Sequence, residues 1–438
     1  MEEENSFHFL YPVILLWFLI EVLFFAVVLY IYKCHLTPLK KPPAITNPRE
    51  SIDSVIRHID YLSELGVCNS DDFFRFFLGA EPSDVKRGNM RSFLAWAMCN
   101  CTFEQTNKKT RLIIEEYIDV FAKKYGYQSL EEDGYNIHVN HVNFTLQPNI
   151  PFIHRPLVAY IGLGLLEMVG SLIYTLNGFQ RMSISNVKYW YKTPAFSSSR
   201  GQDENKNYPL VFFHGICGGY LGYFNMIKAL GGDKEVILVD FSQIRLCNFA
   251  GLKSSPSPQQ YAAVVKKILD RHGIERVSLV GHSFGSITAT WFIKRFPEQV
   301  AHLTLLDPVS ILLGMPDVAV NMIYRTPSNF IELVIFIFAA MDPTVSHTLY
   351  RHFFWNHNLF CIEKDLPPKC NLIIGLSEND EILNARNSFA YANFCKEKMS
   401  DSHNIEVLMW KNFSHAQIML TPSAMKPLYH LMRRNETM

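Results

Sequence analysis

The sequence of 438 residues predicts an α/β fold in its second half, with a mostly parallel, doubly wound sheet. Two observations carry this prediction. From about Arg181 onward, short apolar runs alternate with helical patterns, which is typical of a parallel sheet covered by helices on both faces. In addition, 48% of the residues are hydrophobic and 33 are phenylalanine, so the chain can bury a large core and is not disordered over most of its length.

Charge and cysteine content narrow the function classes. The 41 Lys and Arg residues balance the 41 Asp and Glu residues, whereas a nucleic-acid binder needs a basic surplus. The nine cysteines are scattered and form no C-x-x-C pair, so we interpret them as free thiols in a reducing compartment. We therefore expect no nucleic-acid partner, no metal and no cofactor.

Residues 11–32, YPVILLWFLIEVLFFAVVLYIY, predict a transmembrane helix. Glu21 is their one charged residue. At about 1.5 Å per residue they reach roughly 33 Å, enough to cross a hydrocarbon core of about 30 Å. The alternative is a helix buried inside a protein core, and Glu21 is the residue that favours this alternative.

The flanking charges predict the orientation of this helix. Glu2, Glu3 and Glu4 precede it, and the basic residues Lys33, Lys40 and Lys41 follow it. A cleaved signal peptide has the opposite arrangement, a basic leader before a shorter apolar region. The positive-inside rule instead predicts a single-pass membrane protein whose bulk lies in the cytosol, in a membrane that the sequence does not specify.

Residues 33–46, rich in proline and lysine, predict a linker, and residues 47–180 predict a helical N-terminal region. Asn47 can cap a helix whose apolar residues between Ile52 and Leu62 recur every three or four positions. A further helix is expected over 110–125. We expect this region to serve packing and partner contact, because it holds no recognisable chemical motif.

A second apolar stretch runs from Leu157 to Leu176 and is long enough to cross a membrane. Glu167 and three glycines interrupt it, and a charge in mid-helix is costly in lipid. We expect this helix to pack on the globular domain or to lie on the membrane surface, with a second membrane span as the alternative.

Residues 181–438 form the predicted α/β domain. The expected strands are 187–191, 209–213, 236–240, 277–280, 303–306, 372–374 and 406–410. An aromatic-rich insertion at about 311–368 interrupts the alternation. We expect it to form a helical cap over the carboxyl ends of the strands, where open α/β sheets place their sites.

The candidate nucleophile is Ser283. It lies in Gly281-His282-Ser283-Phe284-Gly285, directly after the strand 277–280 and before a helical pattern. A Gly-x-Ser-x-Gly turn between a strand and a helix lifts the serine hydroxyl out of the sheet. The alternative interpretation is a coincidental turn.

With this motif the chain resembles the α/β-hydrolase superfamily, and in particular a membrane-anchored eukaryotic branch with an N-terminal helical region. His214-Gly215-Ile216, after the strand 209–213, is similar to the oxyanion loop of that family. The resemblance implies that the backbone N–H groups of Ile216 and Phe284 receive the negative oxygen of a tetrahedral intermediate. The alternative interpretation of the His214-Gly215-Ile216 loop is a structural glycine-rich turn.

The resemblance also implies an acid and a histidine, in that order, after the serine. His415 follows the last strand in a loop, whereas His430 falls on a terminal helix. Asp380 occupies the place of the family's acid. Asp307, one strand earlier, is the alternative acid.

These residues together predict a membrane-anchored serine hydrolase that cleaves a lipophilic carboxylic ester through a Ser-His-Asp acyl-enzyme mechanism. The expected partners are a lipophilic ester or acyl substrate and membrane lipid. One alternative is an acyltransferase with the same triad. The other is a non-catalytic, membrane-tethered ligand-binding protein, since a fold alone does not establish a function.

Overall fold

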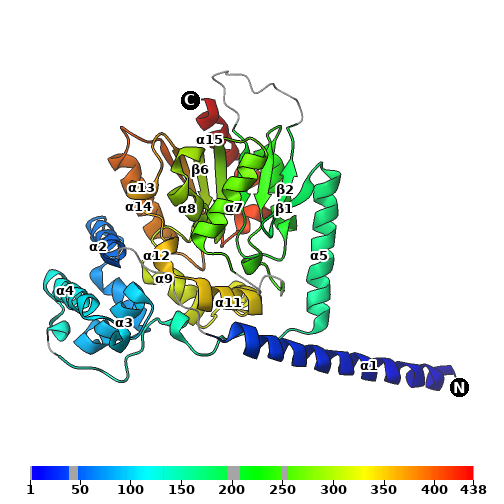
Figure 1. Ribbon diagram of the computed structural model, residues 1–438, viewed down its shortest axis with the longest axis horizontal. Helices are drawn as coiled ribbons and strands as arrows, with labels where there is room; N and C mark the ends of the chain where they lie inside the picture. The colour runs from blue at the N-terminus through cyan, green and yellow to red at the C-terminus, as the bar shows by residue number, and fades with distance from the viewer. Residues whose placement is uncertain (1, 39–47, 132, 195–207, 249–254, 438) are drawn as a thin grey trace.

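The computed structural model describes residues 2–38, 48–131, 133–194, 208–248 and 255–437. A central sheet of eight strands has the order β1-β2-β4-β3-β5-β6-β7-β8. The strands β3 to β8 run parallel, and β1 and β2 are added antiparallel at one edge. The predicted α/β fold is thereby confirmed (Figure 1). The strands are β1 (Gln180–Ile184), β2 (Val187–Lys192), β3 (Leu210–Phe213), β4 (Val236–Val239), β5 (Val277–His282), β6 (Val300–Leu306), β7 (Asn371–Ser377) and β8 (Ile405–Trp410).

Helices cover both faces of the sheet, which explains why all the residues of β3 and β4 are apolar and buried. The aromatic and aliphatic side chains divide into two buried clusters, one on each face. The main helices of the domain are α6 (Phe224–Gly231), α7 (Pro258–Arg271), α8 (Gly285–Arg295), α14 (Ala385–Lys398) and α15 (Lys426–Thr437).

The segment between β6 and β7 forms the cap, a series of short helices below the sheet in Figure 1. Its longest helix is α11, which lies between the sheet and the N-terminal helix. The cap elements are α9 (Pro316–Ala319), η11 (Val320–Tyr324), α10 (Phe330–Ile335), η12 (Phe336–Ala340), α11 (Pro343–His352), α12 (Trp355–Asn358) and α13 (Ile362–Asp365).

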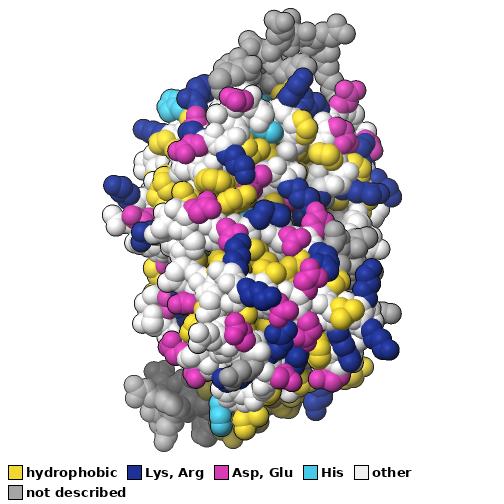
Figure 2. Space-filling model, turned by 90° about the vertical axis from the view of Figure 1, so that its left-hand side faces the viewer, with side chains coloured by type: hydrophobic (Ala, Val, Ile, Leu, Met, Phe, Trp, Pro, Cys, Tyr) yellow, Lys and Arg dark blue, Asp and Glu magenta, His cyan; other side chains and the backbone are white. Residues whose placement is uncertain are grey.

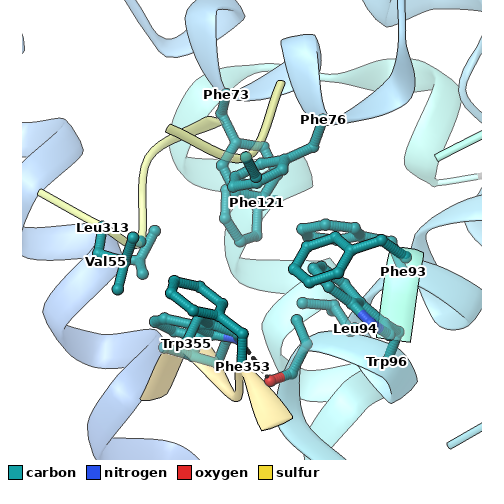
Figure 3. Close-up of a pocket in the computed structure, with 15 residues that line it drawn as sticks. Val55, Phe73, Phe76, Phe93, Leu94, Trp96, Phe121, Leu313, Phe353 and Trp355 are labelled. Atoms are coloured by element: carbon teal, nitrogen blue, oxygen red, sulfur yellow. Dashed lines mark hydrogen bonds between the residues drawn. The ribbon is translucent and has the colours of Figure 1, made fainter. Parts of the chain in front are cut away.

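A lobe of helices α2 (Pro48–Glu64), α3 (Arg87–Cys99) and α4 (Lys108–Tyr125) packs against this cap. Figure 3 shows the contact, where cap residues Phe353 and Trp355 face Phe93 and Trp96 of the lobe. The Trp355 indole donates to the Ala97 carbonyl at 2.9 Å. The space left between them is only about 30 Å³ and apolar, so it is a packing gap and not a ligand site.

The N-terminal helix α1 (Glu2–Ile31) continues into a π-helical turn, η1 (Tyr32–Leu36). Tyr11–Leu36 is long and apolar enough to cross a membrane. The helix therefore extends into the beginning of the predicted linker 33–46, whose residues 39–46 lie outside the described residues. Arg351 of α11 is buried and donates to the Thr37 carbonyl at 2.8 Å and to the Pro148 carbonyl at 3.1 Å. The end of α1 is thus attached directly to the cap.

The helix α5 (Leu157–Leu176) runs crosswise to α1 along one side of the sheet (Figure 1). It is also long and apolar enough to cross a membrane. A bent pair in the cap, Phe330–Ala340 with Pro343–His352, passes the same test of length and composition. One side of α5 packs on the domain: a Cβ added at Gly170 would lie 3.3 Å from the Leu221 side chain.

Candidate active site

Ser283 lies in a strained turn between β5 and α8. Its φ of +53° is in the left-handed region, which non-glycine residues rarely adopt. The turn needs glycine on both sides. A Cβ at Gly281 would lie 2.8 Å from the Gly285 carbonyl oxygen, and one at Gly285 would lie 2.1 Å from the Phe213 carbonyl oxygen. The Gly-x-Ser-x-Gly spacing is therefore a steric requirement of this turn.

Three predicted side chains meet at the carboxyl ends of the parallel strands. His415 follows β8, and its Nε2 lies 2.9 Å from the Ser283 hydroxyl oxygen. Asp380 follows β7, and its Oδ2 lies 2.6 Å from Nδ1 of the same ring. His415 can therefore donate from Nδ1 to the carboxylate while Nε2 accepts from the serine. This is the hydrogen-bond pattern that a base requires to take the serine proton.

The two candidate acids have different contacts. The second oxygen of Asp380 accepts the Ile382 and Leu383 N–H groups at 2.8 and 3.0 Å, so the carboxylate is fixed in orientation. Asp307 instead accepts the Ser377 N–H at 2.7 Å and the Ala416 N–H at 3.0 Å. Asp380 thus bonds the His415 ring, whereas the alternative acid Asp307 bonds the backbone of Ser377, at the end of β7, and of Ala416, next to His415.

The charges around His415 favour its protonated form. Burial lowers the pKa of the ring, but the charge and hydrogen bond of Asp380, followed by the charges of Asp307 and Glu381, raise it to about 9. Burial and the nearby Asp380 charge raise the pKa of Asp307 to about 6. Asp307 is therefore mostly negative at neutral pH, and the two carboxylates that raise the pKa of His415 stabilise the imidazolium that forms when Ser283 loses its proton.

The predicted oxyanion loop lies beside the serine. A Cβ at Gly215 would lie 2.9 Å from the Ser283 Cβ, so only glycine allows this approach. The loop is held by His214, whose Nε2 accepts the Phe241 N–H at 3.0 Å. Among the described residues, the N–H groups of Ile216 and Phe284 have no acceptor. Both remain available for a ligand oxygen.

A cavity of about 710 Å³ lies over Ser283 and His415. Its walls are mostly apolar and come from α5, α10, η12 and the loop after β8. Leu163 and Leu166 of α5 belong to this wall, although the sequence assigned that helix to the N-terminal region. The spacing of apolar residues along α5 does not indicate which part of the chain this helix packs against.

Asp307, Asp380 and His415 also bring three ligand-type atoms within 4.8 Å of one another. Their donors and acceptors are already engaged, with Asp307 bonded to the backbone and Asp380 to both the backbone and the ring. The cluster is therefore arranged as a hydrogen-bond network around one histidine rather than as a set of open metal ligands.

Comparison with known proteins finds similarity to one family profile. A profile described as alpha/beta hydrolase fold matches residues 208–417. Abhydrolase domain-containing protein abhd-5.2 of Caenorhabditis elegans is 27% identical over 125 residues, covering 28% of this chain and 28% of that protein. Triacylglycerol lipase of Pseudarthrobacter phenanthrenivorans is 24% identical over 142 residues, covering 32% and 44%.

The (Lyso)-N-acylphosphatidylethanolamine lipase of Mus musculus is 25% identical over 137 residues, covering 31% of this chain and 39% of that protein. The chain thus spans less than half the length of these three relatives. Among solved structures, a membrane phospholipase A has 16% identity and a TM-score of 0.41, covering 64% of this chain and 97% of that one.

Proposed function

Because residues 208–417 belong to the α/β-hydrolase fold family, we propose that the protein is a membrane-anchored serine hydrolase that cleaves a lipophilic carboxylic ester. The observation that carries this proposal is the continuous hydrogen-bond chain from Asp380 through His415 to Ser283, at 2.6 and 2.9 Å, on the floor of an apolar cavity. An esterase needs an activated nucleophile at the end of a channel that accepts the acyl chain.

The first half of the reaction forms an acyl-enzyme. Ser283 Oγ attacks the ester carbonyl while His415 Nε2 takes its proton, and the carbonyl oxygen becomes negative. The Ile216 and Phe284 N–H groups donate to this oxygen. His415 then gives the proton to the leaving alcohol oxygen as the C–O bond breaks, and Asp380 keeps the ring in the tautomer that both transfers require.

The second half regenerates the serine. Water attacks the acyl carbon with His415 again as base, and the acid leaves with Ser283 reprotonated. An alcohol in place of water would make the same site an acyltransferase, so product analysis separates these two reactions. The names of the lipases among the relatives support a lipophilic ester, as do the apolar cavity walls.

The anchor in this proposal is α1. Its apolar length and the basic residues that follow it support a single-pass arrangement, with the catalytic domain in the cytosol. The substrate would then lie in the membrane that holds the enzyme.

A fluorophosphonate probe tests the proposal, because it modifies only a serine that is activated as a nucleophile. The full-length protein in detergent should be labelled, and Ser283→Ala should not. Ser402→Ala is the matched control, since this exposed serine lies beside the Met399 carbonyl and the His403 ring and has no bond to a triad residue. Equal labelling of wild type and Ser283→Ala would contradict the proposed nucleophile.

A further inference from the structure

The cavity over Ser283 opens onto an apolar surface. Five residues line the cavity and also remain exposed to solvent, which is unusual for large apolar side chains. We call them the apolar rim: Leu166 of α5 (53% exposed), Phe330, Ile331 and Val334 of α10 (78, 44 and 38%) and Leu420 (75%). A substrate that reaches the serine along this wall therefore passes over hydrocarbon side chains and not over polar ones.

The same apolar surface continues along α5. Its inner side is fixed to the domain, where Gly170 contacts Leu221 and the buried Tyr174 hydroxyl donates to the Tyr220 carbonyl at 3.1 Å. The opposite side, the outer face of α5, consists of apolar residues that are all exposed: Val158, Ile161, Leu165, Met168, Val169, Leu172 and Leu176. An exposed apolar surface of this extent indicates a binding partner.

Another face of the molecule is charged rather than apolar. Figure 2 shows a face of the molecule where Lys and Arg side chains are mixed with Asp and Glu over the whole area, with small apolar spots between them. Such a mixture is typical of a surface that meets water. The protein therefore has one side suited to an aqueous phase, and an apolar side along α5.

The position of α1 identifies the partner as a lipid bilayer. Phe24 of α1 packs against Tyr160 of α5 with ring centroids 5.0 Å apart, and Phe25 packs against His154 at 4.8 Å. From this contact α1 extends away from the domain, crosswise to α5 (Figure 1). If the part of α1 that precedes this contact crosses a bilayer, α5 therefore runs along the surface of that bilayer.

The contacts of α5 are those of a surface helix and not of a membrane span. Glu167, in its middle, lies 3.0 Å from Arg245 of the catalytic domain and 3.3 Å from Arg181. A spanning α5 would bring these charged groups into the hydrocarbon core together with the loop around Leu221. A helix with one apolar face, bonded to the domain on the other, is instead placed in the interface.

We infer that the outer face of α5 and the apolar rim lie in the interface of the bilayer that α1 crosses, and that the ester enters the cavity sideways from the lipid. The position of the surface does not depend on catalysis. The entry of the ester rests on the proposed function. Along this route an acyl chain moves from lipid to cavity without meeting water.

Spin-label accessibility tests the position of the surface without any assay of activity. The full-length Cys34→Ser protein is placed in phosphatidylcholine vesicles, with a nitroxide on one cysteine introduced at a time: Leu165→Cys, Met168→Cys, Leu172→Cys or Leu176→Cys. We expect all four labels to be accessible to oxygen, protected from a water-soluble nickel chelate, and at one shallow depth. Leu112→Cys on α4, 71% exposed, is the control that should report water.

Every other pattern would overturn the inference. If the nickel chelate reaches the labels along α5, the outer face of this helix lies in water. A depth that increases steadily along the helix would make α5 a membrane span. Protection from both oxygen and nickel would indicate a protein partner or a second copy of the chain.

A comparison of two substrates tests the route of the ester. In Met168→Lys/Leu172→Lys, two charges enter the outer face of α5 but not the cavity wall. Turnover of a long-chain diacyl ester in phosphatidylcholine vesicles should fall about tenfold or more. Turnover of soluble p-nitrophenyl butyrate and fluorophosphonate labelling should equal those of wild type and of the Leu112→Lys control.

Unchanged turnover of the vesicle ester, or equal loss with both substrates, would overturn the sideways entry. Failure of the wild type to label and to hydrolyse either ester would instead contradict the proposed function, and the spin-label depths would still decide where α5 lies.

Discussion

Both carboxylate oxygens of Glu21 lie 3.0 Å from the backbone nitrogen of Leu157, so the charge within α1 caps the first residue of α5. The first N–H groups of a helix have no partner within the helix, and a negative group placed there is stabilised by the helix dipole. The one charged residue of the apolar segment 11–32 thus has a structural role that is compatible with a membrane helix.

Removing this cap should weaken the joint between the two helices. Glu21→Ala leaves the Leu157 N–H without its acceptor and should cost about 1 kcal/mol, the usual loss of a helix cap. We expect a lower thermal midpoint in detergent, with Glu21→Gln closer to wild type because it keeps an acceptor oxygen. Glu64→Ala, an exposed carboxylate at the end of α2, is the control. A wild-type midpoint for Glu21→Ala would show that the cap contributes nothing.

The triad residues should contribute unequally to ester turnover. Ser283→Ala and His415→Ala should reduce hydrolysis of a medium-chain p-nitrophenyl ester to near background, since either the nucleophile or its base is missing. Asp380→Asn should lower kcat by about 10⁴-fold, because the ring loses its productive tautomer. Double variants should be no worse than the worst single variant, because the three groups act as a unit. Additive losses, or a milder loss for Asp380→Asn than for Asp307→Asn, would contradict the assignment.

The pH profile should report His415. The ring acts as base only when neutral, so kcat/KM should rise with pH through its pKa, which neighbouring carboxylates raise to about 9. Asp307, with a pKa of about 6, is ionised in that range and contributes to the raise. Asp307→Asn should therefore move the rising limb to lower pH while turnover persists. A limb that stays in place or moves to higher pH would show that Asp307 does not act on the ring by its charge.

The turn around Ser283 should not tolerate a larger residue at Gly285. The added Cβ of Gly285→Ala would lie 2.1 Å from the Phe213 carbonyl oxygen, so the backbone must shift at a cost of about 1–3 kcal/mol or more. We expect a lower thermal midpoint and loss of probe labelling. Gly164→Ala in α5 is the matched control, because its Cβ would meet nothing within 4 Å. Equal midpoints for the two variants would contradict the steric argument.

Deleting residues 1–34 should change how the protein is attached to membranes. Without most of α1, the proposed membrane contact of the outer face of α5 should remain, but only as a surface contact. We expect the truncated protein to sediment with vesicles and to be released by alkaline carbonate, whereas the full chain resists this extraction. Resistance of the truncated protein to carbonate would instead show that α5 crosses the bilayer.

The parts of the fold that the sequence predicts well are those with a local physical signature. The runs in β3 and β4 are wholly apolar because both faces are covered. Gly281 is required by the turn at Ser283 itself, because a Cβ there would meet the Gly285 carbonyl oxygen. The edge strand β1 escaped prediction because it is short and half exposed. It is built by a hairpin whose Ser185 and Asn186 have positive φ.

The parts that sequence could not predict are the long-range contacts. The resemblance gave Asp380 as the acid and Asp307 as the alternative, but the contacts of the two carboxylates were not predictable: Asp380 bonds the His415 ring, and Asp307 bonds the backbone of Ala416. Likewise, the apolar pattern of α5 is compatible with a span, a surface helix or a core helix. Gly170 and Glu167 of α5 contact Leu221 and Arg245, which lie more than 50 residues further along the sequence.

The attachment of Arg351 to Thr37 has a mechanical consequence. An opening of the cap would have to break the buried bond between Arg351 of α11 and Thr37, which follows η1, or move the end of the N-terminal helix with it. If α1 anchors the protein as proposed, this link between anchor and cap would set the height of Ser283 above the lipid. Such an enzyme would select esters by the depth of their carbonyl group below the headgroups as well as by chain length.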